Sequence, residues 1–312
     1  MNLATNDWRD KMHPQATFHE KVTILAIGLK GLMCLKSIDP NNLDIINGVV
    51  IGSDKGVVND YSREIQVYCE SNGLRFSTRT SSQQLLESSR YVVAIGWRWM
   101  VKVSYNQELI VFHDSLLPKY RGFNPLVSAL INGEKEIGVT CLLGSDEYDR
   151  GEIISQYRSK IDYPIKIQEA IELVSEGYAS LFSDLLNAVK AAQGLHHLKQ
   201  NEKEATYSVW RDEEDYRICW QESSNKIKRF IDAVGYPYKG ARATLGDQEI
   251  IIVDAEVAQP YFVENRGVGK VLFKDGELPT VICGEGLLKI NKIAGADGQP
   301  LSFPKNFRYR FK

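Results

Sequence analysis

Short apolar segments alternate with longer polar segments between residues 22 and 113 of this 312-residue chain. The apolar segments have the length of buried strands and lie at 22–28, 48–53, 74–78, 91–97 and 108–113. Because strands that alternate with helices usually pair in parallel, we predict an α/β domain with a doubly wound parallel sheet. Such a sheet binds ligands at the carboxyl ends of its strands, and His113 stands at one of these ends.

The pattern changes in the second half of the chain. Residues 167–193 have apolar residues at helical spacing and predict a long amphipathic helix, and the polar segment 199–206 is typical of a linker. After one further helix, short segments broken by Gly and Asp indicate a small antiparallel β domain, of barrel type. The sequence therefore predicts four parts: an N-terminal extension (1–21), the α/β domain (22–198), the linker (199–206) and the β domain (207–312).

Composition excludes several classes of protein. Hydrophobic residues make up 43% of the chain and the formal net charge is -2, which does not predict binding to nucleic acid or to a membrane. The five cysteines are scattered without a C-x-x-C pair, which favours reduced thiols over a zinc site or disulfides. The first 21 residues lack the apolar core of a signal peptide. We expect a cytoplasmic protein without a metal site.

A carboxylate that orients an imidazole can move protons at neutral pH. His113 has two candidate partners, the adjacent Asp114 and the distant Asp149. Neighbouring residues on a strand point to opposite faces, so Asp149 is the better partner if the two loops meet. The plain alternative is a hydrogen-bonded structural histidine and an ordinary turn. The segment 28–31, GLKG, lacks the G-x-G-x-x-G pattern and does not predict a nicotinamide cofactor.

Residues 113–156 carry an ordered set of motifs. A histidine, S-L-L-P, R-G, a proline, N-G-E, G-V-T and D-x-G-x-I-I stand at 113, 115–118, 121–122, 125, 132–134, 138–140 and 149–154. This order resembles the signature of the folate-dependent formyltransferases, and segments 218–241 and 284–301 resemble the C-terminal barrel domain of some members. The resemblance covers residues 22–302. It implies a Rossmann-like catalytic domain followed by a small OB-like β-barrel.

The resemblance also implies a chemistry. The family transfers a formyl group from 10-formyltetrahydrofolate to an amine, with the histidine, here His113, relaying a proton and the aspartate, here Asp149, holding it. By position in the motifs, the folate pocket would include Trp97, Arg98, Trp99, Met100, Leu142, Leu143, Gly144 and Asp146. The loop at the acceptor's entry would be Ser115, Leu116, Leu117, Pro118, Lys119, Tyr120 and Arg121, although Lys119 to Arg121 also fit a plain solvated loop.

This chain departs from the family at Val111. Members carry an asparagine two residues before the histidine, and its amide polarises the formyl oxygen, which a valine side chain cannot do. Removing one such donor typically costs about 100- to 1000-fold in rate. Leu142 and Ser128 are further departures, at positions where relatives often carry histidine and tryptophan.

Three interpretations of Val111 stay open. Asn124 or a backbone N–H replaces the missing donor; the protein carries out a related reaction, such as hydrolysis of the formyl donor; or it binds folate without catalysis. The persistence of His113 and Asp149 argues against a pure scaffold.

The acceptor is the least determined part. The tRNA-specific members carry a basic insertion and a basic C-terminal domain, whereas residues 206–312 here contain sixteen Lys or Arg against fifteen Asp or Glu. This balance disfavours tRNA. We therefore expect a small amine substrate, by default a nucleotide-linked amino sugar, with a methionyl-tRNA formyltransferase-like enzyme as the alternative. A homodimer is left open.

Overall fold

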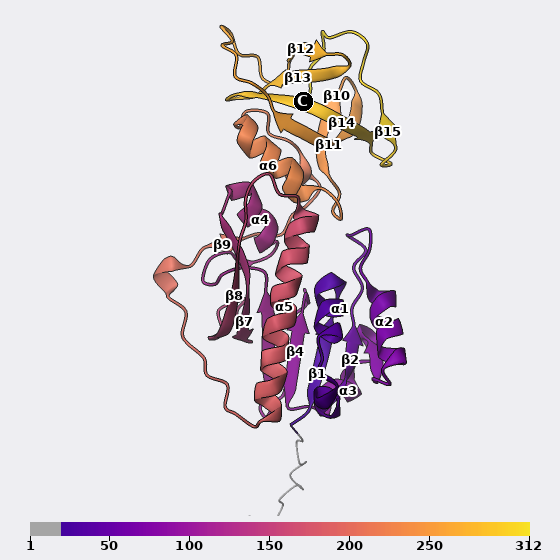
Figure 1. The fold of residues 1–312 in the computed structure, drawn as a ribbon, viewed down its shortest axis with the longest axis vertical. Helices are drawn as coiled ribbons and strands as arrows, with labels where there is room; N and C mark the ends of the chain where they lie inside the picture. Colours follow the sequence, from indigo (N-terminus) through magenta and orange to yellow (C-terminus); the bar gives the residue numbers. More distant parts are fainter. Residues whose placement is uncertain (1–19) are drawn as a thin grey trace, which may run out of the picture.

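The computed structural model of the protein describes residues 20–312, so most of the predicted N-terminal extension lies outside the described residues. A seven-stranded sheet forms the centre of the α/β domain (Figure 1), with the strand order β3-β2-β1-β4-β5-β7-β8. Its strands are β1 (Val22–Ala26), β2 (Ile46–Ile51), β3 (Phe76–Thr78), β4 (Tyr91–Ile95), β5 (Glu108–His113), β7 (Glu136–Leu143) and β8 (Ile153–Lys160). The predicted doubly wound domain is confirmed.

The sheet is mixed rather than wholly parallel. The first five strands pair in parallel, whereas β7 is antiparallel to both β5 and β8. The register places His113 opposite Thr140 and Ile110 opposite Leu143. The chain therefore enters β7 at the same edge of the sheet at which it leaves β5, and no helix crosses the sheet between them. Because a buried antiparallel strand is as apolar as a parallel one, the sequence pattern could not reveal this reversal.

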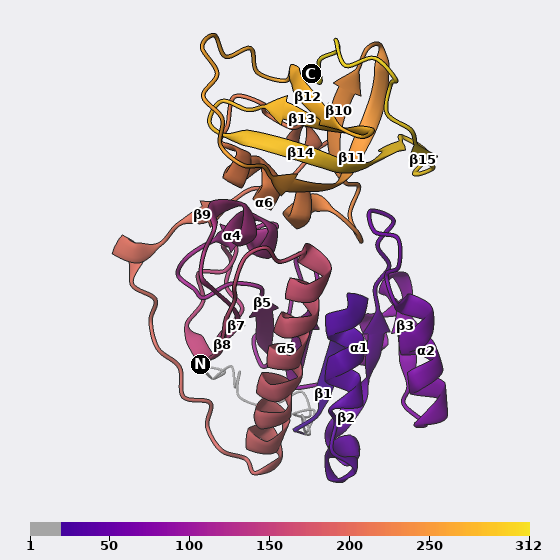
Figure 2. The same ribbon diagram turned by 45° about the horizontal axis from the view of Figure 1, so that its top comes forward.

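Helices cover the sheet and fill the connections. They are α1 (Gly28–Lys36), α2 (Ser62–Ser71), α3 (Gln83–Glu87), α4 (Pro125–Asn132) and α5 (Ile167–Lys190). The long α5 lies alongside α1 (Figures 1 and 2) and buries one apolar face that includes Tyr178 and Phe182. Both rings pack against Phe112 of β5. Since Phe112 points toward α5, its neighbours Val111 and His113 point to the opposite face of the sheet. No helix within residues 20–312 is long and apolar enough to cross a bilayer.

The C-terminal part is a closed antiparallel barrel. It follows α6 (Ser224–Val234) and consists of β10 (Ala241–Leu245), β11 (Gln248–Val257), β12 (Val271–Asp275), β13 (Leu278–Ile282), β14 (Leu287–Gly295) and β15 (Pro300–Leu301). β10 and β12 are the two edges of its sheet. The last residues close the gap between them, because Lys312 exchanges two backbone hydrogen bonds with Thr244 while the Phe311 amide donates to Gly269. The predicted β domain is therefore a barrel in which the final residues are structural.

The two parts are joined by more than a connecting segment. β9 (Tyr207–Ser208) pairs in parallel with β6 (Arg121–Gly122), directly after the segment that was predicted to be a linker. Helices α4 and α6 pack together, and the Arg229 Nε donates to the Ile131 carbonyl at 3.0 Å. These contacts hold the start of the C-terminal part against the loops that follow β5.

Candidate active site

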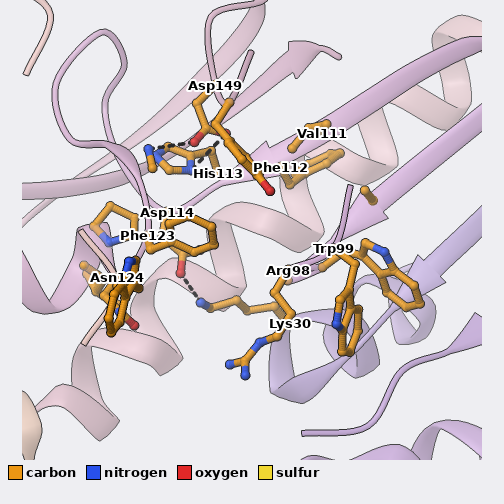
Figure 3. A pocket seen from close by; sticks show the side chains of 18 of the residues that line it. Lys30, Arg98, Trp99, Val111, Phe112, His113, Asp114, Phe123, Asn124 and Asp149 are labelled. Carbon is orange, nitrogen blue, oxygen red and sulfur yellow. Dashed lines mark hydrogen bonds and ion pairs between the residues drawn. The ribbon is translucent and has the colours of Figure 1, made fainter. Parts of the chain in front are cut away.

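A cavity of about 510 Å³ lies at the carboxyl ends of β4 and β5 (Figure 3). Most residues predicted for the donor and the chemistry line it: Trp97, Arg98, Trp99, Met100, Val111, His113, Asn124, Leu142, Leu143, Gly144 and Asp149. Asp146 and the whole segment Ser115 to Arg121 do not. The structure thus brings the strand-four loop, the end of β5 and the loop after β7 to one place, and leaves the predicted entry loop elsewhere.

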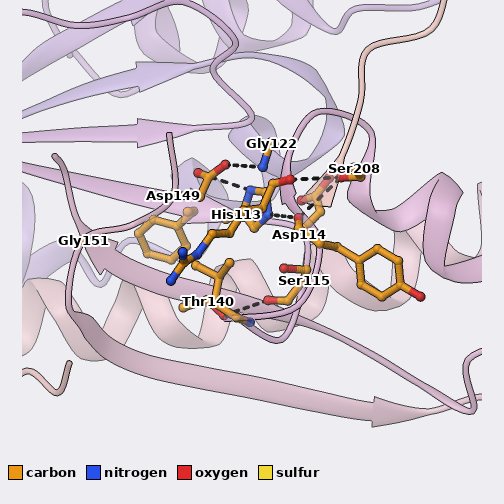
Figure 4. Close-up of polar contacts among 12 residues, drawn as sticks. His113, Asp114, Ser115, Gly122, Thr140, Asp149, Gly151 and Ser208 are labelled. Carbon is orange, nitrogen blue, oxygen red and sulfur yellow. Dashed lines mark hydrogen bonds and ion pairs between the residues drawn. The ribbon is translucent and has the colours of Figure 1, made fainter. Parts of the chain in front are cut away.

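His113 and Asp149 meet in this cavity (Figure 4). The His113 Nδ1 lies 3.4 Å from an Asp149 carboxylate oxygen, and both side chains are about nine-tenths buried. The other ring nitrogen, Nε2, lies 2.8 Å from the Tyr120 carbonyl oxygen. Each nitrogen faces an oxygen that accepts hydrogen bonds, so a ring that carries protons on both nitrogens donates to both. The second Asp149 oxygen accepts a hydrogen bond from the Gly122 amide at 2.8 Å.

The backbone around His113 is unusual. Tyr120, Asn124 and Asp149 have φ values of 59°, 50° and 56°, in the left-handed region that non-glycine residues seldom adopt. Strained backbone of this kind persists where the surrounding structure fixes it, and it clusters at functional sites. Here the three residues supply the carbonyl at Nε2, a side-chain amide in the cavity and the carboxylate at Nδ1.

The floor of the cavity is apolar beside His113. Val111 is paired across β5 and β7 with Leu142, so two of the three departures from the family lie next to each other on one face. Leu142 is fully buried, and Val111 packs with Leu109 and Trp97 on the same small apolar cluster. In the view of Figure 3, His113 lies between Val111 and Asn124. The Asn124 side chain makes no hydrogen bond with any residue of 20–312, so its amide is free to face a ligand.

The predicted entry loop surrounds a different and smaller cavity, of about 250 Å³. Ser115, Leu116, Leu117, Pro118, Lys119 and Tyr120 line it. The Lys119 ammonium lies 3.7 Å from Glu134, and the Tyr120 hydroxyl donates to the same carboxylate at 2.8 Å. The backbone of this loop is held by Thr140, whose hydroxyl accepts from the Leu117 amide and donates to the Ser115 carbonyl.

Arg121 lines neither cavity, because it is completely buried beneath the predicted linker. Its guanidinium donates to the Gln200 side-chain oxygen at 2.8 Å and to both carboxylate oxygens of Glu202 at 2.8 and 2.9 Å. Gln200 in turn donates to the backbone carbonyls of Asp149 and Gly151, at 2.8 and 2.7 Å. The segment 199–206 therefore ties Arg121 to the loop that carries Asp149. We call Arg121, Gln200 and Glu202 the linker clamp.

Replacing Gln200 by alanine is expected to loosen the loop that carries Asp149. Two backbone carbonyls would lose their donor, and an unsatisfied buried polar group costs about 1–3 kcal/mol. We expect a drop of that size in the free energy of unfolding, measured with urea. The matched control is Gln168→Ala on the exposed face of α5, where the side chain bonds only to Glu172, with an expected change within about 0.5 kcal/mol. Equal effects of the two substitutions would contradict the clamp.

The clamp also predicts a pH dependence. Hydrogen bonds from Arg121, which has the larger effect, and from Arg150 lower the pKa of Glu202 from its ordinary 4.5 to about 2. A lowered pKa means that the ionised carboxylate favours the folded state, so its contribution is complete above pH 4.5 and is lost as the pH falls toward 2. The stability difference between the wild type and Glu202→Gln should be present at neutral pH and vanish across that window. Salt should weaken it, since Glu202 is half-exposed. A difference that persists at the acid end would contradict this assignment.

Sequence reasoning named Asp114 only as a candidate partner of His113 and missed the buried group that Asp114 forms with Lys30 and Tyr178. Asp114 accepts a hydrogen bond from Lys30 (Figure 3). It accepts another, at 2.5 Å, from the Tyr178 hydroxyl. Burial raises the pKa of Tyr178 well above its ordinary value. Burial acts to raise the pKa of Asp114 too, but the Lys30 charge and the hydrogen bonds from Lys30 and Tyr178 outweigh it, and that pKa is lowered. Asp114 is thus an ionised partner of Lys30 and is not paired with His113.

A second group that sequence reasoning missed comes from the C-terminal side of the cavity. Five residues of that part line it: Trp210, Arg211, Tyr216, Tyr238 and Lys239. Tyr238 and Lys239 lie in the segment 218–241 that resembles the family's C-terminal domain, whereas no motif marks Trp210, Arg211 and Tyr216. The place of these three residues shortly after the linker clamp becomes informative only once the contact between the two parts is known.

Comparisons with known proteins match segments of both parts of the chain. A family model described as "Formyl transferase" matches residues 99–176, and one described as "Formyl transferase, C-terminal domain" matches residues 211–310. The chain belongs to the formyltransferase family. The matched N-terminal segment includes His113 and Asp149, and the C-terminal one begins at Arg211.

Similar proteins include one named for a tRNA substrate and one named for a sugar substrate. The chain is 33% identical over 191 residues to a methionyl-tRNA formyltransferase of Hydrogenobaculum sp., and the match spans 61% of each protein. It superposes on an N-formyltransferase from Helicobacter canadensis, solved with folinic acid and dTDP-3-aminofucose, with TM-score 0.67 and 18% identity over 90% of this chain and 99% of that one. It also superposes on WlaRD, a sugar 3N-formyl transferase, with TM-score 0.64 and 20% identity, over 90% and 97% of the two chains. At these identities the structural matches establish the fold.

Proposed function

We propose that the protein transfers a formyl group from 10-formyltetrahydrofolate to a primary amine. The observation that carries the proposal is the buried pair of His113 and Asp149 in a cavity at the carboxyl ends of β4 and β5. Proton transfer by a positioned imidazole is what the attack of an amine on a formyl carbon requires. Membership of the formyltransferase family supports the same reaction.

The donor would occupy the half of the cavity between the strand-four loop and the loop after β7. Trp97 and Trp99 lie edge to face there, with ring centroids 5.0 Å apart. Trp97 packs on the apolar cluster below it, whereas the Trp99 ring is covered by the Arg79 guanidinium at 4.6 Å. With Leu142 and Val111 as the floor and the tryptophans beside them, this half has apolar and aromatic walls, which suit the pterin ring of a folate.

Formyl transfer makes one C–N bond and breaks another. The acceptor nitrogen adds to the formyl carbon, the carbonyl oxygen becomes negative, and tetrahydrofolate leaves as the oxygen returns its electron pair. The amine loses one proton and the leaving nitrogen gains one, and His113 is the group placed to carry it, with Asp149 stabilising the charged ring. Since both ring nitrogens are bonded in this structure, one contact has to open when the acceptor arrives.

The negative formyl oxygen needs a hydrogen-bond donor, and Asn124 is the side chain we assign to it. It lines the cavity, its amide is not bonded to residues 20–312, and a left-handed backbone holds it at the start of α4. Donors that are in place before reaction stabilise such charge most effectively. With Asn124 in place of the family's asparagine as the donor, formyl transfer remains possible. This assignment therefore favours a transferase over a hydrolase or a folate-binding protein without activity.

The acceptor we propose is a nucleotide-linked amino sugar. Two of the structural neighbours are named as enzymes for such substrates, and the balanced charge of residues 206–312 disfavours a long nucleic acid. A methionyl-tRNA acceptor is the second candidate, because two curated relatives that are 32–33% identical to this chain carry that name.

Release of tetrahydrofolate from 10-formyltetrahydrofolate tests the proposal. The assay would include no amine, a panel of nucleotide-linked amino sugars, or methionyl initiator tRNA. Release that depends on one amine would support the proposal and identify the acceptor class. Release without any acceptor would indicate a hydrolase, and no release under any condition would contradict the proposed activity.

A further inference from the structure

Arg211 differs from the other cations that line the active-site cavity. Lys30 is paired with Asp114, Arg98 with Asp54 and Lys239 with Glu213. Within residues 20–312, Arg211 has no acidic partner, and its guanidinium makes one hydrogen bond, from Nη1 to the backbone carbonyl of Asp215 at 3.1 Å. Its Nε is buried and has no hydrogen-bond partner among the described residues.

A guanidinium that has unused hydrogen-bond donors beside a cavity is suited to bind an anion. A buried N–H without an acceptor costs free energy, and a charged donor gains more from an anionic acceptor than from a neutral one. The guanidinium presents a planar fork that matches the oxygens of a phosphate. The Arg211 guanidinium can therefore bind a phosphate, because donors of this group are not used within the described residues.

The position of Arg211 places this contact on the side of the cavity that holds Asn124. Strand β9, which ends three residues before Arg211, is bound to β6, and the Phe123 amide donates to the Ser208 carbonyl at 3.1 Å. The donor half is lined instead by the strand-four loop and the loop after β7. Arg211 is thus tied to the part of the cavity that a folate would leave for the acceptor.

The residues on either side of Arg211 in the chain indicate which kind of phosphate-containing ligand it binds. Trp210 lines the same cavity and is 63% exposed, so its ring offers a flat face on which a base can stack. Residues 212–215 are Asp-Glu-Glu-Asp, all exposed. Four acidic residues that directly follow Arg211 in the chain repel an extended polyanion, whereas a compact phosphate group needs only the guanidinium itself. This arrangement favours a nucleoside diphosphate over the acceptor arm of a tRNA.

We propose that Arg211 binds the phosphate of a nucleotide-linked amine while Trp210 stacks on its base, so that this pair selects the acceptor. The proposal rests on the function proposed above and assigns the acceptor's recognition to the first residues after β9. It makes Arg211 a specificity-determining residue with no part in proton transfer. Its loss should therefore raise the KM for the acceptor and leave the site for the donor intact.

Calorimetric titrations with dTDP, UDP and folinic acid test the pair. We expect Arg211→Gln to weaken binding of the preferred diphosphate by roughly 10- to 100-fold, the loss of a charged hydrogen bond. Arg211→Lys should fall between, because it keeps the charge without the fork, and Trp210→Ala should weaken binding independently. The matched control is Arg217→Gln, six residues further on, whose side chain pairs with Glu214 and Glu249 outside the cavity; its affinities should be unchanged.

The outcomes separate this proposal from the one on which it rests. Equal diphosphate affinity in the wild type and Arg211→Gln, or no diphosphate binding by a wild type that binds folinic acid, would overturn the assignment of Arg211 alone. Binding of a tRNA acceptor-end oligonucleotide in place of either diphosphate would also overturn it. A wild type that fails to bind folinic acid would contradict the proposed function itself, in a titration that does not involve Arg211.

Discussion

Replacing His113 by alanine is expected to lower the rate of formyl transfer about 100- to 10,000-fold, the usual worth of a positioned general acid–base group. The ring is buried and held at both nitrogens, so its loss removes the side chain that is positioned to carry the proton. Binding of the folate should change little, because the floor and the two tryptophans of the donor half do not depend on the ring. The measurement is kcat with saturating donor and acceptor, with folinic acid binding as the second readout.

A second histidine provides the control for this prediction. His197 is also paired with a carboxylate, that of Glu152, but both residues lie outside the cavity. His197→Ala should keep kcat within about twofold, in line with the small effects of surface substitutions. Asp149→Asn should resemble His113→Ala in direction, because an amide holds the Gly122 contact but cannot stabilise a charged ring. Equal rates for His113→Ala and the wild type would remove His113 from the mechanism.

Replacing Asn124 by glycine is expected to lower kcat about 100- to 1000-fold, the cost of one oxyanion donor. Glycine is the matched substitution because it adopts the left-handed backbone of this position without strain, so that only the side-chain amide is lost. Asn124→Asp keeps the size of the side chain and removes the donor, and it should also be slow. The KM for the donor should change much less than kcat.

The substitution Val111→Asn tests whether Asn124 replaces the asparagine that family members carry at position 111 as the donor to the formyl oxygen. In the Asn124→Gly background, an asparagine at position 111 should restore a large part of the lost rate, because it places an amide beside His113 on the same face of β5. In the wild-type background it should change the rate by less than about tenfold. An inactive wild type that becomes active through Val111→Asn alone would contradict the assignment of Asn124.

Much of the fold follows from local sequence, and its exceptions have physical causes. The predicted strand 108–113 coincides with β5, and the long helix predicted from 167 begins at Ile167 and ends at Lys190, three residues before the predicted end. The direction of β7 could not be predicted, because it depends on which edge of the sheet the chain re-enters. The barrel closure by Lys312 and Phe311 could not be predicted for a similar reason, because it depends on contacts with the distant residues Thr244 and Gly269.

The residues of the site also fall into those that the sequence could predict and those that it could not. Alternation along a strand separated Asp149 from Asp114 as the partner to expect for His113, and the structure places them accordingly. Arg121 looked like part of an entry loop because its partners, Gln200 and Glu202, stand about eighty residues further on in a polar segment typical of a linker. Arg211 and Trp210 could not be linked to the cavity without knowing that β9 pairs with β6. Contacts between distant segments are what a single sequence does not contain.

The most direct measurement is the fate of a carbon-13-labelled formyl group. The wild type and His113→Ala would each be incubated with labelled 10-formyltetrahydrofolate and the nucleotide-linked amino sugars, and the products analysed by mass spectrometry. We expect the wild type to give a labelled formamide on one amino sugar, in an amount equal to the tetrahydrofolate released, and His113→Ala to give almost none. Label that appears only as free formate, with every amine unmodified, would contradict formyl transfer as the function of this site.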